Sequence, residues 1–178
     1  ITTMGSGNAG TTNTLRMFGW KAGLITLLGD ILKTLLAIFV VWLLFHRSEP
    51  EGVRLLELYA GFGTILGHNF PFYMCLRKGE KKKGGKGIAV SFGVLLALFP
   101  IWKPVLLLAF FYILFSVVFK IRSHRRRSIV TFGCFCVGCL SLVPIPSILL
   151  GCVLISCIVI YKHHLMEEKS NESANLIL

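Results

Sequence analysis

The chain has 178 residues, of which 54% are hydrophobic and 15% are charged, and its formal net charge is +11. Soluble domains are about 45–50% apolar and about 25% charged, so this composition excludes an ordinary soluble enzyme. The apolar residues form long blocks, which predicts an all-α, polytopic transmembrane helix bundle. The basic residues cluster between those blocks, as in membrane proteins, and therefore do not indicate a nucleic-acid-binding protein.

The chain opens with a polar segment, residues 5–16, that reads GSGNAGTTNTLR. Glycines let backbone N–H groups approach a ligand together, and small hydroxyl and amide side chains add directed hydrogen bonds. Arg16 adds a two-pronged donor that suits phosphate. The segment predicts an oxyanion-binding loop at the membrane surface. A plain polar linker, or a turn with Thr12 or Asn13 as a helix N-cap, is an alternative of equal weight.

An apolar span over residues 22–45 follows, and its only charged residues are Asp30 and Lys33. A separation of three residues places both side chains on one face of a helix. Charged groups inside a membrane tend to face the protein interior or a wet cavity. The pair is therefore either a structural ion pair or part of a site, and the sequence favours neither.

A polar loop at residues 46–54 leads to a second predicted span over residues 55–76. The end of this span is interrupted, because Pro71 ends or kinks a helix and frees backbone groups that a ligand could use. His68 lies beside that break and is a candidate site residue. A structural histidine is the alternative.

Residues 77–87 form a basic loop that reads RKGEKKKGGKG. Glycine next to lysine provides close backbone amides and a mobile positive charge, which together suit a phosphate group. Lys83 and Lys86 are the candidate phosphate ligands. The loop contains no Walker motif. A plain cytoplasmic basic loop is the alternative.

Two long apolar runs complete the predicted bundle, and each is too long for a single span of about 20 residues. The run over residues 88–119 has a turn signal at Pro100 and Lys103, and the run over residues 128–161 has Pro144-Ile145-Pro146 at its middle. Each run therefore predicts a hairpin of two helices, which gives six spans in all.

The distribution of lysine and arginine predicts the orientation of these spans. With loops assigned alternately to the two sides, fifteen of these residues lie on one side and three on the other. The positive-inside rule places the richer side in the cytoplasm, together with the opening segment, the basic loop and the tail. We expect residues 1–170 to form one membrane-embedded domain and residues 171–178 to form a disordered tail.

Cysteines at positions 134, 136 and 139 are spaced closely enough to suggest a metal site. No histidine or carboxylate lies nearby in the sequence to complete a ligand shell, so small packing residues of a membrane helix are the favoured interpretation. We expect no metal and no cofactor.

Several of these motifs together resemble the bacterial acyl-phosphate:glycerol-3-phosphate acyltransferase family (PlsY type). Residues 5–16 match its first motif, G-S-G-N-x-G-x-T-N-x-x-R, throughout, and Asp30-Ile31-Leu32-Lys33 fits its D-x-x-K. Residues 67–72 (GHNFPF) and 83–89 (KGGKGIA) resemble the two halves of its second motif. The resemblance covers nearly the whole chain.

The chain departs from the family pattern at three places. Extra residues around 77–82 separate the halves of the second motif. In the third motif, which resembles H-x-x-N-x-x-R, His163 (or His164) fits, whereas Met166 stands at the asparagine position and no arginine follows. The family also has seven spans, so we expect a further helix before Ile1 in the full-length protein.

The resemblance implies transfer of a fatty acyl group from acyl-phosphate to the 1-hydroxyl of glycerol 3-phosphate, giving lysophosphatidate and phosphate in the bacterial inner membrane. No covalent acyl-enzyme is expected, because acyl-phosphate has a good leaving group and positioning with charge stabilisation can suffice. The candidate catalytic residues are Ser6, His68, Lys86 and His163. The candidate phosphate- or carbonyl-binding residues are Gly5, Gly7, Asn8, Gly10, Thr12, Asn13, Arg16, Lys83, Gly84, Gly85 and Gly87, with Asp30 and Lys33 as further possibilities.

Two other classes of function fit the same residues. An anion transporter would also use basic, glycine-rich loops and charges within the membrane, although its polar motifs would be expected near the membrane midplane. A non-catalytic membrane scaffold is the second alternative. The expected partners are the two phosphate-bearing substrates and the lipid bilayer, and the sequence does not define an oligomeric state.

Overall fold

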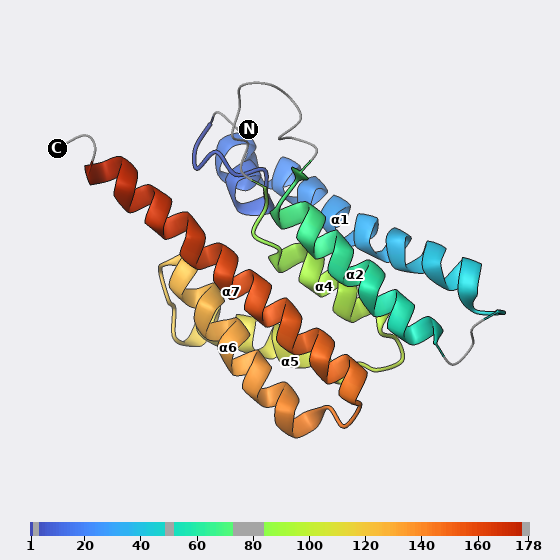
Figure 1. Ribbon diagram of the computed structural model, residues 1–178. Coiled ribbons are helices and arrows are strands. Elements are labelled where there is room, and N and C mark those ends of the chain that lie inside the picture. Colours follow the sequence, from blue (N-terminus) through green and yellow to red (C-terminus); the bar gives the residue numbers. More distant parts are fainter. Residues whose placement is uncertain (2–3, 49–51, 73–83, 176–178) are drawn as a thin grey trace. The chain divides into compact units, whose positions relative to one another are not determined.

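In a computed structural model of the chain, the described residues are 1, 4–48, 52–72 and 84–175, with the backbone alone described for 166–175. They form α-helices and one π-helical turn (Figure 1). The helices gather into two compact units, Ile1–Trp102 and Lys103–Leu178. Each unit is described by itself, and the single domain expected from the sequence stays a prediction.

The first unit contains three described helices, α1 (Thr11–Phe45), α2 (Val53–Asn69) and α4 (Ile88–Ala97). Helix α1 packs against both of the others, and the three lie side by side (Figure 1). Helix α2 ends two residues before Pro71, whose ring disfavours a helical conformation at the residue before it. The break predicted near His68 is therefore confirmed, at the carboxyl end of α2.

Helix α1 is sharply bent at Gly19, whose φ of 85° and ψ of 178° lie outside the helical region. The bend turns the chain back so far that a Cβ on Gly23 would lie 2.8 Å from the Cβ of Leu15. A straight helix would separate these two positions by about 12 Å, because it rises about 1.5 Å per residue. The apolar segment predicted over residues 22–45 is thus the long arm of α1, and a short arm carries Thr11 to Phe18.

Small residues let the three helices approach closely. A Cβ on Gly61 of α2 would lie 2.8 Å from Val94 Cγ1 of α4, and a Cβ on Gly93 of α4 would lie 2.9 Å from Thr34 Cβ of α1. Glycine at such positions is typical of helix contacts in membranes, where close packing replaces the hydrophobic effect as the driving force.

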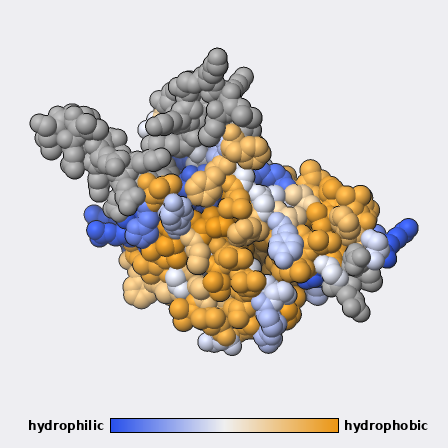
Figure 2. All heavy atoms as spheres, viewed as in Figure 1, coloured by the Kyte–Doolittle hydropathy of each residue, from blue (hydrophilic) through white to orange (hydrophobic). Residues whose placement is uncertain are grey.

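The long arm of α1 exposes apolar side chains and buries polar ones. Ile25, Leu32 and Leu36 are 71%, 60% and 62% exposed, whereas Asp30 and Thr34 are 8% and 0% exposed. Figure 2 shows hydrophobic residues over most of the visible face. Apolar exposure on this scale suits a lipid environment. By length and composition, the helices Thr11–Phe45 and Pro146–Leu165 could each cross a membrane.

The second unit contains α5 (Lys103–Ile113), the π-helical turn η1 (Leu114–Val118), α6 (His124–Leu142) and α7 (Pro146–Asn175). Helix α6 packs against both α5 and α7. Pro146 opens α7, which is the first-turn position where proline needs no N–H partner. The turns of both predicted hairpins lie where the prolines indicated, between Ala97 and Lys103 and between Leu142 and Pro146.

The core of the second unit lies between α6 and α7, where Phe132, Phe135, Ile148 and Val159 are almost fully buried.

The number of membrane crossings stays a prediction, since α4 has 10 residues and a helix of that length covers about 15 Å of a hydrocarbon layer about 30 Å thick. Helix α7 continues to Asn175, into the segment expected to be disordered.

Candidate active site

A cavity of about 390 Å³ lies in the first unit, where the long arm of α1, the end of α2 and the glycine loop before α4 meet. A volume of this size suits a small ligand. The residues that line the cavity come from four segments far apart in the sequence: Ala9, Asp30, Lys33, Thr64, Gly67, His68, Pro71, Gly84 and Gly85.

One wall of the cavity is an ion pair that includes a histidine. Lys33 Nζ lies 2.6 Å from Asp30 Oδ1 and 2.7 Å from His68 Nδ1, so a single ammonium group joins α1 to α2. His68 Nδ1 is itself 3.5 Å from Asp30 Oδ1. Both alternatives left open for Asp30 and Lys33 thus apply in part, because the two side chains form an ion pair and also line the cavity.

The glycine loop forms an adjoining part of the cavity lining and is packed against the end of α2. A Cβ on Gly84 would lie 2.4 Å from Pro71 Cδ, and a Cβ on Gly85 would lie 1.7 Å from His68 Nε2. Gly85 N–H donates to the His68 carbonyl at 2.9 Å, which fixes the loop to the helix. The two halves of the second motif therefore form one structural unit that no residue with a Cβ could build in the same way.

The glycine loop leads directly into α4. Gly87 is the N-cap of this helix and has a φ of 82°, a left-handed conformation that favours glycine. The unpaired N–H groups in the first turn of a helix carry partial positive charge, so they favour an anion. Lys86, which is partly exposed, lies immediately before this turn. Lys83 lies outside the described residues.

The opening loop is organised around the side chain of Asn13. Asn13 Oδ1 accepts a hydrogen bond from Ser6 N–H at 3.0 Å, and Asn13 Nδ2 donates to the Met4 carbonyl at 3.0 Å. Gly5 has a φ of 58°, and a Cβ there would lie 2.3 Å from Asn13 Oδ1. Asn13 therefore shapes the loop through these bonds. Gly10 is the N-cap of α1, so the alternative that placed Thr12 or Asn13 there is wrong.

Two polar atoms of the same loop are buried and have no hydrogen-bond partner among the described residues. They are Asn8 Oδ1 and Thr11 Oγ1. The loop reaches the cavity through Ala9, which lies between them in the sequence. Ser6, Thr12 and Arg16 are exposed. The opening segment and the second motif thus both line one cavity, and its binding of phosphate stays a prediction.

His163 lies on α7 in the second unit and is 1% exposed, whereas its neighbour His164 is exposed. Its proposed contact with a substrate stays a prediction, because the two units are described separately.

The sequence did not single out Thr64 or Ala9, although both line the cavity. Thr64 lies four residues before His68 on α2, so the helical period places both on one face. This spacing could have identified Thr64 from the sequence. Ala9 has no reactive group, and only the fold shows that its loop reaches this wall.

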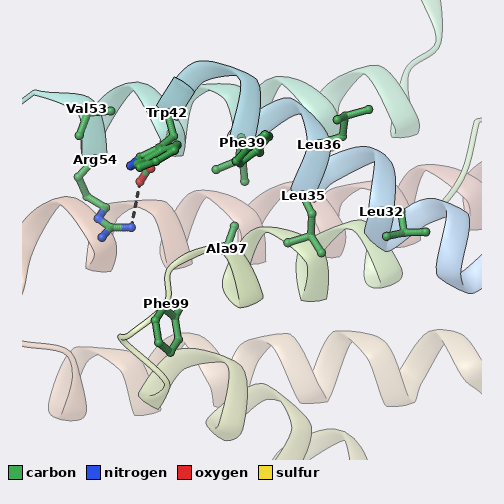
Figure 3. Close-up of a pocket in the computed structure, with 11 residues that line it drawn as sticks. Leu32, Leu35, Leu36, Phe39, Trp42, Val53, Arg54, Ala97 and Phe99 are labelled. Atoms are coloured by element: carbon green, nitrogen blue, oxygen red, sulfur yellow. Dashed lines mark hydrogen bonds and ion pairs between the residues drawn. The ribbon is translucent and has the colours of Figure 1, made fainter. Parts of the chain in front are cut away.

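A second pocket of about 610 Å³ lies at the other end of the first unit (Figure 3). Most of its lining is apolar, with Leu35, Phe39 and Trp42 from α1 and Ala97 from α4. Arg54 and Glu57, near the start of α2, pair at 2.9 Å in its wall. This pocket is remote from His68, which lies at the opposite end of the same helix.

The fold and the site together define a class of protein, a helical protein with an apolar, lipid-facing surface and a cavity lined by a glycine loop, a histidine and an ion pair. A sequence model of the family described as "Glycerol-3-phosphate acyltransferase" matches residues 1–169. The chain belongs to the glycerol-3-phosphate acyltransferase family.

Named relatives agree with this assignment. A glycerol-3-phosphate acyltransferase of Trichlorobacter lovleyi is 36% identical over 160 residues, which are 90% of this chain and 74% of that protein. A Streptococcus thermophilus protein of the same name is 39% identical over 145 residues, 81% of this chain and 59% of that protein. The chain therefore spans between about three fifths and three quarters of the length of these two relatives.

Two solved structures share the fold. One is the glycerol 3-phosphate form of PlsY, described as an integral membrane glycerol 3-phosphate acyltransferase, with a TM-score of 0.69 and 24% identity over 96% of this chain and 76% of that chain. The other is its lysphosphatidic acid form, with a TM-score of 0.70 over 96% of this chain and 78% of that chain. The all-helical fold predicted from the sequence is thereby confirmed.

Proposed function

We propose that the protein transfers a fatty acyl group from acyl-phosphate to the 1-hydroxyl of glycerol 3-phosphate in a bacterial inner membrane, with its active-site loops in the cytoplasm. The observation that carries the proposal is the cavity at which the glycine loop, His68 and the opening loop meet. Membership of the acyltransferase family supports the same reaction.

The reaction needs two phosphate-bearing molecules in one place. The glycerol hydroxyl attacks the acyl carbonyl carbon, the C–O bond to phosphate breaks, and the hydroxyl proton passes to the departing phosphate. A phosphate oxygen is a sufficient base, so no protein carboxylate is required for this step. The protein supplies proximity and stabilises negative charge, both of which lower the barrier.

The roles of individual residues follow from their chemistry. Arg16, Lys83 and Lys86 neutralise phosphate charge, and the amides of Gly84 and Gly87 approach phosphate oxygens, whereas the Gly85 N–H is held by the His68 carbonyl. The opening loop, with Ser6, Asn8, Gly10, Thr12 and Asn13, forms the second phosphate or carbonyl cradle. His68 and His163 donate hydrogen bonds to substrate oxygens. Ala9 in the lining of the cavity supports the participation of the opening loop.

The test is an assay of the purified protein in lipid with acyl-phosphate and radiolabelled glycerol 3-phosphate. We expect phosphate and labelled lysophosphatidate to form in equal amounts, and phosphate release to be slow without the acceptor. Lys86→Ala removes a phosphate ligand and is expected to lose most of the activity. Lys103→Ala, an exposed lysine at the start of α5, is the matched control and should keep it.

Two results would contradict the proposal. A wild-type protein that is folded but releases no phosphate would favour an anion transporter or a scaffold, and anion uptake by the same vesicles separates these two. Normal turnover by Lys86→Ala would contradict the proposed role of Lys86 as a phosphate ligand, but it would not contradict the proposed reaction.

A further inference from the structure

Lys33 occupies an unusual place for a lysine in an apolar helix, because its ammonium group lies between a carboxylate and an imidazole. The distances are 2.6 Å to Asp30 Oδ1 and 2.7 Å to His68 Nδ1. Both are within hydrogen-bond range, and both partners have largely buried side chains, 11% and 9% exposed.

This contact determines which nitrogen of His68 carries the proton. A lysine ammonium group has three donors and no acceptor, so the nitrogen that faces it must accept. His68 Nδ1 is therefore unprotonated while Lys33 is in place, and the proton of the neutral ring is on Nε2. Lys33 thus makes Nε2 a hydrogen-bond donor.

The Nε2 end of the ring lies at the glycine loop. A Cβ on Gly85 would lie 1.7 Å from Nε2 and 2.4 Å from Cε1, so the ring edge lies directly against this residue. His68 and Gly85 both line the cavity. An N–H at this edge favours a phosphate oxygen nearby, whereas a lone pair at the same place would repel it.

The charges argue against Lys33 as a phosphate ligand in its own right. The carboxylate of Asp30 neutralises the ammonium group at 2.6 Å, so the pair adds no net charge to the cavity. Asp30 is nevertheless needed, because it lowers the cost of a lone charge within an apolar helix.

We propose that Asp30 and Lys33 are positioning residues that hold His68 as a neutral Nε2–H donor facing the phosphate-binding cavity. This inference rests on the proposed acyl transfer. It adds to that function a residue pair within the membrane span that controls substrate binding through one histidine.

The proposal predicts a specific failure when Lys33 is lost. Asp30 Oδ1 is 3.5 Å from His68 Nδ1, so without Lys33 it becomes the acceptor for a proton on Nδ1. The neutral ring then switches tautomer, and Nε2 presents its lone pair to the cavity. At low pH the ring carries both protons, and the Nε2–H donor returns.

The other charged groups near His68 do not mimic this behaviour. On the described parts of the elements around the ring, the charged residues are Arg16, Lys21, Asp30 and Lys33 of α1 and Lys86 before α4, and Asp30 and Lys33 lie within 3.5 Å of the ring, while α4 itself has no titratable side chain. Arg54 and Glu57 lie at the other end of α2.

The test measures kcat and KM for each substrate between pH 6 and 8, with every value divided by that of the wild type at the same pH. For Lys33→Met we expect kcat/KM to be lower roughly tenfold or more at pH 8, the effect of one hydrogen bond turned into a repulsive contact. At pH 6 we expect recovery to within about threefold of the wild type, since a histidine gains its second proton between about pH 5 and 8.

Three further variants separate positioning from a merely structural role. Lys33→Arg keeps a donor toward Nδ1 and should retain most activity at both pH values. Asp30→Asn/Lys33→Met leaves no unpaired charge, and it should fold even if Lys33→Met does not. It should lose less activity at pH 8 than Lys33→Met does, because no carboxylate then enforces the Nδ1–H tautomer. In His68→Gln, the amide N–H of glutamine replaces the Nε2 donor. Adding Lys33→Met to this variant should change activity less than twofold, because the effects of two residues are not additive when one acts through the other.

The proposal is overturned if the loss in these lysine variants is the same at pH 6 and pH 8, or if the losses of Lys33→Met and His68→Gln simply multiply. Both outcomes presuppose an active wild type. A wild type that makes no lysophosphatidate instead overturns the proposed function, so the two failures are distinguishable.

Discussion

At the scale of single residues, the site depends on glycines, which have no Cβ. Gly84 and Gly85 let the loop lie against Pro71 and His68 at distances that no Cβ permits. The contact fixes the loop through its backbone and without a charged side chain. Glycine at these positions is a requirement of packing as much as of flexibility.

Gly85→Ala should therefore reduce kcat/KM by at least about tenfold, because overpacking of this kind costs about 1–3 kcal/mol and displaces the loop or the ring. Phosphate release and thermal unfolding in detergent measure the two consequences. Gly63→Ala is the matched control, since a Cβ at Gly63 meets nothing within 4 Å. Equal activity of the two variants would show that the loop does not contact the reacting groups.

A second residue-scale prediction concerns Asn13, whose side chain bonds to the backbone of Met4 and Ser6. Asn13→Ala should release the opening loop and raise KM about tenfold, because it removes the two hydrogen bonds that hold the loop, each worth about 0.5–1.5 kcal/mol. Thr26→Ala, which removes one local bond to Ala22 within α1, should leave KM unchanged. A normal KM for Asn13→Ala would mean that this loop does not hold substrate.

At the scale of elements, glycine contacts decide how closely the three helices of the first unit approach. Gly61 of α2 faces Val94 of α4, and Gly93 of α4 faces Thr34 of α1. These contacts adjoin the cavity, because Thr34 follows Lys33 and Gly61 lies less than one turn before Thr64, so they set the distance between its walls. A change in helix spacing would reach His68 and the glycine loop without touching either.

Gly61→Ala should lower the unfolding temperature, because the new Cβ would lie 2.8 Å from Val94 Cγ1. The expected loss is about 1–3 kcal/mol. Gly61→Ala/Val94→Ala removes the atoms that clash and should recover much of that loss, while Gly29→Ala, with open space around it, should cost little. If the double variant unfolds at the same temperature as Gly61→Ala, the contact with Val94 is not the cause of the lost stability.

At the scale of the whole molecule, charge predicts the direction in which the chain enters the membrane. Single cysteines placed at exposed serines, Ser48→Cys after α1 and Ser123→Cys before α6, test it in a chain whose six native cysteines are replaced. An impermeant maleimide added to intact cells with a permeable outer layer should label position 48, and should label position 123 only after the membrane is opened. The reverse pattern would invert the proposed topology.

Much of the fold follows from the sequence, because proline and apolar length leave few alternatives. The end of α2 near Pro71 and the turn before Pro146 lie where these residues predict them. The bend at Gly19 was not predicted, since glycine within an apolar run is also tolerated in a straight helix. The span was instead predicted to begin at residue 22.

The sequence predicted which residues form the site better than it predicted the role of each residue. The spacing of Asp30 and Lys33 predicted that they share a helix face, but their contact with His68 depends on how α2 packs. Asn13 was expected in a ligand cradle, and its bonds to Met4 and Ser6 arise only when the chain turns back on itself. Distant pairings of this kind have no local sequence signal.

The contact between the glycine loop and His68 also bears on inhibitor resistance. A compound that fitted against the wall formed by Gly84 and Gly85 would bind a surface that substitution can scarcely alter, because every other amino acid adds a Cβ that collides with Pro71 or His68. A substitution in this wall that excluded such a compound would also disturb the packing of the loop. The cavity wall built from glycine is therefore the part of this protein where resistance to an inhibitor is hardest to acquire.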